Sequence, residues 1–308
     1  MPILPVEAPP SSAPLQRLPA ATWALYGWTG VRRVMMGFSV RSLWPAAALV
    51  LLVAPAGMLG EAVAADLAPH RAFYDGRMEV KGAGDGVVAA SGRMVTSLER
   101  ACDGWITSAQ SIVDATLEGG QTVRQDIRFA SWESLDGTAY RFSSRQRIGD
   151  VEMGFKGAAR STGPAGGDVE YTVPERKTIA LPPATLFPTA FLVSLIDRAR
   201  AGDRQHVGTM FEGAGGTGPQ RVAAFIGARQ SPASDAATRL GTLAARPGWR
   251  VQIGFYEPDS RSPSPDYEIE VLQLDNGIVT EMLMSMGTAS VRFTMLKVEA
   301  LAVPRCAP

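Results

Sequence analysis

The stretch Leu181–Arg204 reads LPPATLFPTAFLVSLIDRARAGDR, and the rest of the chain is organised around it. Pro182, Pro183 and Pro188 keep the approach to it extended or kinked, because proline lacks the N–H that a helix interior needs. Gly202 is the expected stop signal. Apolar residues recur at the three-to-four spacing of a helix with a wide packed face, at Phe187, Phe191, Leu192, Leu195, Ile196 and Ala199. We therefore predict one long amphipathic helix here.

Most of the remaining sequence after residue 66 is patterned as β-strand. Runs that alternate in polarity, or are rich in β-branched and aromatic residues, are separated by Gly, Asp, Pro and Ser. Asp275-Asn276-Gly277 predicts a tight hairpin, since Asn and Gly tolerate positive φ, whereas Gly227–Gly248 has little pattern and is expected to be a surface excursion. The predicted strands are Arg77–Lys81, Gly86–Arg100, Trp105–Leu117, Thr122–Trp132, Ala139–Ile148, Val151–Lys156, Val169–Thr172, Lys177–Leu181, Gln205–Glu212, Gln220–Ile226, Trp249–Tyr256, Tyr267–Leu274, Ile278–Ser285 and Ser290–Val298.

This pattern predicts a mainly β fold, with a many-stranded antiparallel open barrel or spiral-like sheet wrapped around one long helix. Such a sheet exposes two edges unless it curls or closes, and an amphipathic helix is a suitable plug for a curled sheet. Aromatic residues on the strand patterns are expected to fill the core. A groove beside the helix, where an apolar ligand or a partner segment would lie, is expected at Phe187, Phe191, Leu192 and Leu195.

The region before residue 66 carries the signals of protein export. Residues 1–34 are rich in proline and alanine and are expected to be a disordered extension, or to precede the true start near Met35. Residues 35–65 then form a signal peptide: Arg41 supplies the positive charge, Leu43–Leu59 the apolar run, and Ala62-Val63-Ala64 or Val63-Ala64-Ala65 the cleavage site. A single membrane anchor is the alternative, weakened by prolines and glycines in the apolar run. We expect a periplasmic protein of residues 66–308, one β domain without a stable membrane span after cleavage.

The charges and the scarce histidines exclude several classes of function. Thirty basic residues balance thirty acidic ones, which leaves no electrostatic footprint for nucleic acid. His70 and His206 are the two histidines, too few for a multi-histidine metal site. No metal and no cofactor is expected.

No catalytic motif stands out in the sequence. The patterns G-x-S-x-G, S-x-x-K and H-E-x-x-H are missing, and we predict that the protein is not an enzyme. Glu268 and Glu270 share one face of a predicted strand, which is typical of the solvated side of a sheet. An enzyme acting on envelope polymers through these acids and Asp103 is the competing hypothesis.

A glycine-rich run, Gly213-Ala214-Gly215-Gly216-Thr217-Gly218, satisfies G-x-G-x-x-G in letters alone. A phosphate-binding loop of this kind needs a helix immediately after it. Pro219 and the predicted strand Gln220–Ile226 follow instead, so the run is interpreted as a flexible turn.

Cys102 and Cys306 are the two cysteines of the chain. An exported protein places them in an oxidising compartment, where two thiols allow one intramolecular pairing. A bond between them would fasten the tail Val303–Pro308 to the N-terminal third of the mature chain. Two unpaired thiols are the alternative.

Several stretches together resemble one known family. They are Leu67-Ala68-Pro69-His70-Arg71-Ala72-Phe73-Tyr74, Ala101-Cys102-Asp103-Gly104-Trp105, Leu181-Pro182-Pro183-Ala184-Thr185-Leu186-Phe187-Pro188, Phe211-Glu212-Gly213-Ala214-Gly215-Gly216 and the tail Cys306. In this order they are similar to the EipB (DUF1849) family, periplasmic cell-envelope integrity proteins of alphaproteobacteria, and the resemblance spans residues 66–308.

The resemblance implies a spiral-like β-sheet around a helix and a disulfide between Cys102 and Cys306. It also implies a role in keeping the cell envelope intact through other periplasmic proteins, including a tetratricopeptide-repeat protein. The family offers no established catalytic residues to carry over. The expected function is therefore non-enzymatic maintenance of envelope integrity, and the alternative is a carrier or binding protein for an apolar envelope ligand.

Overall fold

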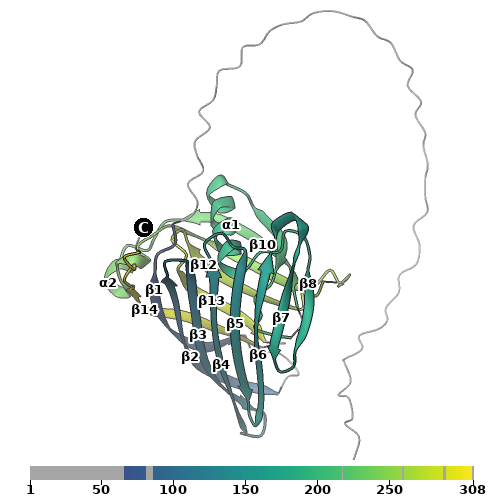
Figure 1. Cartoon of the computed structure of the whole chain (residues 1–308). Helices are drawn as coiled ribbons and strands as arrows, with labels where there is room; N and C mark the ends of the chain where they lie inside the picture. Colours follow the sequence, from purple (N-terminus) through teal and green to yellow (C-terminus); the bar gives the residue numbers. More distant parts are fainter. Residues whose placement is uncertain (1–65, 81–85, 217, 259, 287–288, 307–308) are drawn as a thin grey trace, which may run out of the picture. The chain divides into compact units, whose positions relative to one another are not determined.

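Figure 1 shows the fold as a computed structural model that describes residues 66–80, 86–216, 218–258, 260–286 and 289–306. The predicted extension 1–34 and signal peptide 35–65 lie outside the described residues. Within those ranges the helices are α1 (Pro188–Ala201) and α2 (Ala236–Leu240), with short 3-10 turns at η1 (Gly163–Ala165) and η2 (Thr242–Ala244). Strands make up most of the remainder.

The described strands form one 14-stranded antiparallel sheet, which confirms the mainly β prediction. Every predicted strand overlaps an observed one, although β1 begins at His70 rather than Arg77. The strands are β1 (His70–Val80), β2 (Val87–Arg100), β3 (Gly104–Leu117), β4 (Thr122–Ser134), β5 (Ala139–Ile148), β6 (Val151–Ser161), β7 (Gly167–Val173), β8 (Lys177–Leu181), β9 (Gln205–Met210), β10 (Gln220–Gln230), β11 (Gly248–Tyr256), β12 (Tyr267–Leu274), β13 (Val279–Met286) and β14 (Ala289–Ala300).

The strand order shows two wings that meet at a central pair. The order is β8-β7-β6-β5-β4-β3-β2-β1-β14-β13-β12-β11-β10-β9. The chain therefore runs outward from β1 to β8, passes through α1, and returns from β9 to β14. β1 pairs with β14 from His70↔Ala300 onward, so the first and the last strand in chain order lie side by side in the middle of the sheet (Figure 1).

β8 and β9 are the two edges of the sheet, and the sheet does not close between them. The segment that leaves β8 bridges part of this opening. The Leu186 N–H donates to Thr209 O at 2.9 Å, and the Phe211 N–H donates to Leu186 O at 3.0 Å. The result is an open barrel whose two edges are linked at one end by the approach to α1.

α1 confirms the long amphipathic helix at the centre of the predicted fold. Pro188 opens it, because the N–H that proline lacks would have no partner in the first turn. Gly202 ends it at φ +90°, and its N–H donates to Ala199 O at 3.2 Å. Leu181 itself ends β8, so the helix begins seven residues after the start of the quoted stretch.

The helix contributes to the core on both wings. Its buried side chains, Phe191, Leu195, Ile196 and Ala199, pack with residues of β9–β12, including Val222 and Val251. Phe187, directly before the helix, packs instead with aromatic residues of β5 and β7. Burial of this apolar area against both wings is the main contribution that holds the helix in place.

The predicted hairpin and the predicted excursion both have definite structures. β12 and β13 are joined through Asp275-Asn276-Gly277, with the Leu274 N–H donating to Ile278 O at 2.7 Å and Gly277 at φ +91°. This confirms the hairpin. Gly227–Gly248 differs from the expectation of an unpatterned excursion: β10 continues to Gln230, and α2 covers β14 with Leu240 buried.

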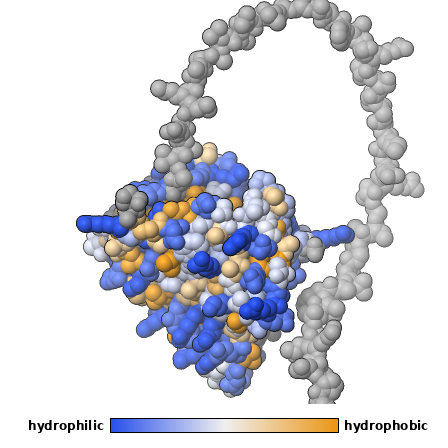
Figure 2. Space-filling model, in the orientation of Figure 1, coloured by the Kyte–Doolittle hydropathy of each residue, from blue (hydrophilic) through white to orange (hydrophobic). Residues whose placement is uncertain are grey.

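One surface of the described sheet is drawn in Figure 2, and it mixes hydrophilic and hydrophobic side chains rather than presenting one continuous apolar area. Such a mixture is typical of an antiparallel sheet with one solvated face. The ion pairs across the strands follow this rule. Arg250 of β11 pairs with Glu270 of β12 at 2.8 Å and with Glu281 of β13 at 3.1 Å.

Candidate functional site

Phe187 lies in an aromatic cluster between the start of α1 and the β5–β7 wall. Its ring stacks on that of Tyr140, with centroids 4.9 Å apart and planes 12° apart. Phe142, Tyr171 and Phe211 complete the cluster, and Phe187 has no exposed surface. Phe187 is therefore packed in the core, where it fixes the entry to the helix.

Phe191 and Leu195 face the opposite wing and are also packed in the core. They are 5% and 2% exposed, respectively. The Phe191 ring stacks on the His206 ring of β9, with centroids 4.9 Å apart. Three of the four residues predicted to line a groove thus fill the space between the helix and the two wings. Their spacing is that of a packed helix face, which sequence cannot distinguish from the wall of a groove.

Leu192, the fourth predicted groove residue, lines a cavity of about 200 Å³ between α1 and the wall of β1–β3. The Tyr74 hydroxyl donates to Val279 O at 2.8 Å, and burial raises the pKa of Tyr74 to about 12. Burial also lowers the pKa of His70, whose Nδ1 lies 2.7 Å from Ala68 O. Both groups are consequently neutral near pH 7, so this cavity suits an uncharged occupant.

A buried carboxylate that sequence reasoning missed, Glu133 of β4, holds the beginning of α1. It accepts hydrogen bonds from the backbone N–H groups of Thr189 at 2.7 Å and Ala190 at 2.8 Å. Glu133 is 2% exposed, and burial raises its pKa although these two bonds lower it. The signal in the sequence was indirect. Phe187 at the N-cap has no side-chain acceptor, so a cap had to come from elsewhere.

Glu133 also lies at the edge of a larger, open cavity of about 500 Å³. Trp105 of β3 and Arg198 of α1 line it, together with the β4–β5 turn. Three aspartates, Asp136, Asp197 and Asp203, line it as well, so most of its charged side chains are acidic.

The glycine-rich segment after β9 is held against the β5–β8 wall by side-chain donors. They bond to consecutive or nearly consecutive backbone carbonyl groups: Tyr140 to Glu212 at 2.8 Å, Gln146 to Ala214 at 2.9 Å, Tyr171 to Gly215 at 3.4 Å and Lys177 to Gly216 at 3.4 Å. β10 follows the segment, as expected, so it precedes no helix that could bind phosphate. Its role is to line the wall of β5–β8.

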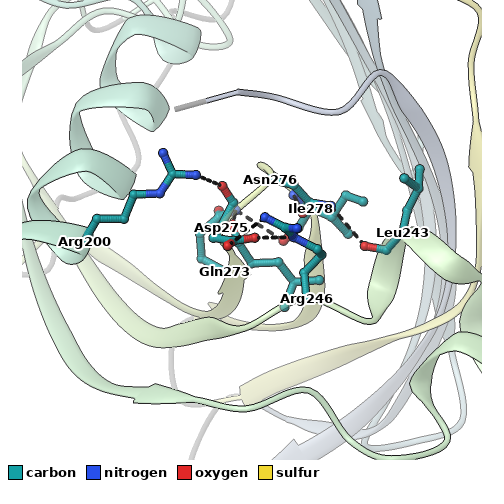
Figure 3. A network of polar contacts seen from close by, with 8 residues as sticks. Arg200, Leu243, Arg246, Gln273, Asp275, Asn276 and Ile278 are labelled. Atoms are coloured by element: carbon teal, nitrogen blue, oxygen red, sulfur yellow. Dashed lines mark hydrogen bonds and ion pairs between the residues drawn. The ribbon is translucent and has the colours of Figure 1, made fainter. Parts of the chain in front are cut away.

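A polar network surrounds the β12–β13 hairpin (Figure 3). The Arg246 guanidinium donates to both carboxylate oxygens of Asp275, at 2.8 and 3.0 Å. Arg200 of α1 donates to the Asp275 carbonyl at 2.9 Å, and the Asn276 amide donates to Leu243 O at 3.0 Å. The hairpin is thereby fixed to α1 on one side and to the segment around η2 on the other.

A disulfide joins Cys102, in the turn between β2 and β3, to Cys306, which follows β14. The sulfurs are 2.10 Å apart, the Cα atoms are 5.4 Å apart, and the bond spans 204 residues of sequence. This is the pairing that the family resemblance implied. The bond fastens the C-terminal tail to the turn that precedes Trp105.

The three acids of the enzyme hypothesis have separate partners in the structure. Asp103 accepts a hydrogen bond from Trp132 Nε1 at 3.2 Å. Glu268 accepts one from Gln252 at 3.2 Å, and Glu270 pairs with Arg250 at 2.8 Å. Among the described residues, no group of three or more His, Cys, Asp and Glu side chains is arranged to hold a metal ion.

The described part of the chain has two α-helices, α1 and α2. None of its helices has both the length and the apolar character needed to cross a bilayer.

Comparison with known proteins places the whole described sheet in one family. The family model described as EipB-like matches residues 61–302. The chain is 27% identical over 252 residues to the cell envelope integrity protein EipB of Brucella abortus (strain 2308), covering 79% of this chain and 88% of that protein. A crystal structure of a beta-barrel-like protein of DUF1849 from Brucella abortus matches with a TM-score of 0.72 at 24% identity, over 78% of this chain and all of that one. This protein belongs to the EipB-like family.

Proposed function

We propose that this protein is a non-enzymatic periplasmic protein that maintains the integrity of the cell envelope through protein–protein interaction. The observation that carries the proposal is the match to a relative named cell envelope integrity protein, over 88% of that relative's length. A 14-stranded sheet linked by a disulfide at its C-terminal tail adds a suitable physical basis. It is a scaffold with a large outer face on which partners can bind.

Deletion of the gene tests the envelope role. Cells without the protein are expected to become sensitive to detergent and to antibiotics directed at the cell wall, and the wild-type gene is expected to restore resistance. Unchanged survival under both stresses would contradict the proposal. Genes that carry Glu268→Gln or Glu270→Gln are expected to restore resistance fully in the deletion strain. Failure of either variant to restore it would favour an enzyme.

Export is tested on the protein recovered from cells. The predicted signal peptide at 35–65 should be removed, so that N-terminal sequencing of the periplasmic protein finds a start near Asp66. A product that keeps the apolar run and stays with the membrane fraction would instead indicate a membrane anchor.

The partner is expected among periplasmic proteins, and a tetratricopeptide-repeat protein is the first candidate. Repeats of this kind stack into a concave surface that can hold another folded protein. Crosslinking in the periplasm followed by purification of the tagged protein should recover such a protein. Recovery must be lost when the tagged protein is replaced by an unrelated exported protein of similar size.

The second candidate function is that of a carrier for an apolar envelope ligand, and the neutral cavity beside Leu192 favours it. Its volume of about 200 Å³ lies below the range of about 300–1,000 Å³ that is usual for ligand sites, so a short apolar chain is the largest occupant expected. Mass spectrometry of protein purified without detergent should then detect a hydrophobic ligand. The Leu192→Trp variant, whose larger side chain fills the cavity, should carry no such ligand. Protein without any such ligand would end this alternative.

A further inference from the structure

A shallow groove crosses the outer face of β4–β7, on the side of the sheet opposite to the aromatic cluster. Its volume is about 470 Å³. Along these strands, residues exposed to solvent alternate with residues that point into the core, such as Phe142 of β5 and Tyr171 of β7, and the exposed residues line the groove. The groove is therefore formed by the outward-facing side chains of four neighbouring strands.

Small outward side chains make the floor of the groove. Ala130 of β4 pairs with Ser143 of β5, and Ala158 of β6 pairs with Arg141 of β5. The pairing of β6 with β7 shifts between Lys156 and Gly157, a β-bulge that locally increases the twist of the sheet. Short side chains beside such a bend leave a depression that a larger side chain from another molecule can enter.

Trp132 forms one wall and is held in place. Its Nε1–H donates to Asp103 at 3.2 Å, and the Arg141 guanidinium lies 4.9 Å from its ring centroid. Trp and Arg are among the residue types enriched where binding energy concentrates in protein interfaces. A tryptophan already fixed on the surface loses little further side-chain entropy when it is covered.

The charged residues that line the groove have no ion-pair partner among the described residues, whereas the charged residues beside the groove do. On the same outer face, nearer the β3–β4 and β5–β6 turns, three arginines form ion pairs. Arg124 pairs with Asp114 at 2.7 Å, Arg128 with Asp126 at 3.2 Å, and Arg147 with Glu152 at 2.6 Å. Among the described residues, neither Arg141 nor Lys156 forms an ion pair, although both line the groove. Glu170, at the β7 side, is also without an ion-pair partner in that part of the chain. With respect to the described residues, the groove thus has two cations and one carboxylate without an ion-pair partner.

We propose that this groove binds an extended acidic segment of a partner protein. An apolar side chain of the segment lies on the floor against Trp132, and its carboxylates pair with Arg141 and Lys156. The inference rests on the proposed interaction function, for which it names the surface and the chemistry of the partner.

The same observations favour a peptide over an anionic membrane. Membrane surfaces attract broad clusters of basic residues. Here the neighbouring arginines are paired with carboxylates of this chain, so the basic area is limited to Arg141 and Lys156. Two cations on the adjacent strands β5 and β6, beside small side chains and Trp132, match a segment in which acidic and apolar residues alternate.

Binding is tested with the purified protein and labelled synthetic octapeptides. One alternates Glu with Phe and Leu, the second carries Gln in place of every Glu, and the third carries Lys. Fluorescence anisotropy should show the acidic peptide bound about tenfold or more tightly than the Gln peptide, with affinity falling as salt rises. Equal binding of the acidic and Gln peptides, or binding of neither, would overturn the proposal.

Variants locate the binding on the groove. Trp132→Ala and Arg141→Glu should each weaken binding of the acidic peptide by about tenfold or more, the effect expected of interface anchors. Arg147→Glu is the matched control, because Arg147 is on the same strand and face but is paired with Glu152, and it should bind nearly as the wild type does. Arg141→Glu changes an exposed side chain, so it remains informative if Trp132→Ala disturbs folding. Unchanged binding in Arg141→Glu would overturn the proposal.

Other occupants give distinguishable results. Flotation with phosphatidylglycerol vesicles tests a membrane, and sedimentation tests a second copy of the chain. If either association is lost in Arg141→Glu while the acidic peptide does not bind, the groove has a different occupant and the proposal fails.

Complementation separates this inference from the proposed function. If deletion sensitises cells and the Arg141→Glu gene restores resistance fully, the envelope role stands and the groove is not its docking surface. If deletion has no effect, the envelope role fails, and the peptide measurements still decide what the groove binds.

Discussion

The carboxylate of Glu133 accepts a 2.7 Å hydrogen bond from the backbone N–H of Thr189, a residue 56 positions later in the chain. A second bond, from the Ala190 N–H at 2.8 Å, reaches its other oxygen. β4 therefore caps α1, a role usually filled by the residue directly before a helix. Because α1 connects the two edge strands, this contact couples the helix to the wing that carries β4.

Glu133→Ala should destabilise the fold, because two N–H groups at a buried helix end lose their acceptor. The expected loss in free energy of unfolding is about 1–3 kcal/mol, measured by urea denaturation. Glu133→Gln keeps one oxygen acceptor and should lose less. Glu118→Ala, which removes an exposed carboxylate in the β3–β4 turn, is the control and should change little. Equal stability of Glu133→Ala and Glu118→Ala would contradict the capping role.

Removal of the Cys102–Cys306 bond should lower stability substantially, because the bond closes a loop of 204 residues. The chain-entropy argument gives about 5 kcal/mol for a loop of this length, as an upper figure. Reduction of the wild type, and the Cys102→Ser/Cys306→Ser double variant, should show the same loss in urea denaturation. Reductant should leave the double variant unchanged. A wild type with equal stability in both redox states would show that the tail needs no fastening.

Gly213 should not tolerate a side chain. It lies at φ +74°, and an added Cβ would come within 2.5 Å of the Phe142 ring in the aromatic cluster. Gly213→Ala should therefore cost roughly 2 kcal/mol or more, from backbone strain and overpacking together. Gly208→Ala is the matched control, since a Cβ on Gly208 of β9 would meet no atom within 4 Å. Thermal unfolding of both variants measures the difference.

The parts of the fold that sequence could predict are those set by local pattern. The alternation of the strands, the spacing of α1 and the turn chemistry of Asp275-Asn276-Gly277 each depend on neighbouring residues, and each was confirmed. Two cysteines left one intramolecular pairing to consider. Contacts between distant segments were not predictable. Nothing near Glu133 indicates that it caps a helix.

The candidate site was less predictable than the fold for the same reason. The spacing of Phe187, Phe191, Leu192 and Leu195 shows that one helix face is apolar, and packing then decides which residues reach a cavity. Leu192 lines the cavity between α1 and β1–β3, whereas Phe187, Phe191 and Leu195 are buried in the core. Trp132 was predicted as a core aromatic, because it lies on a strand pattern. The structure instead places its ring on the outer face, beside Arg141.

The pH dependence of stability should reveal His206. This side chain is 6% exposed, its ring stacks on Phe191, and neither ring nitrogen has a hydrogen-bond partner among the described residues. Burial lowers its pKa, and the nearby Arg198 lowers it further. The unfolded chain, with a pKa near 6.5, therefore binds a proton more readily than the folded one. Stability is fully present above about pH 6.5 and is lost as the pH falls towards the lowered folded pKa.

His206→Phe keeps the stack on Phe191 without a titrating group, so the melting temperature should fall less between pH 7.5 and pH 5.5 than it does in the wild type. His70 is the internal comparison, because it is the other histidine of the chain and burial lowers its pKa as well. The His206→Phe variant should retain the part of the pH dependence that His70 contributes, and the additional His70→Phe change should reduce the acid-induced loss further. If the melting temperatures of His206→Phe and the wild type fall by the same amount on acidification, then His206 is not held neutral by the contact between β9 and α1.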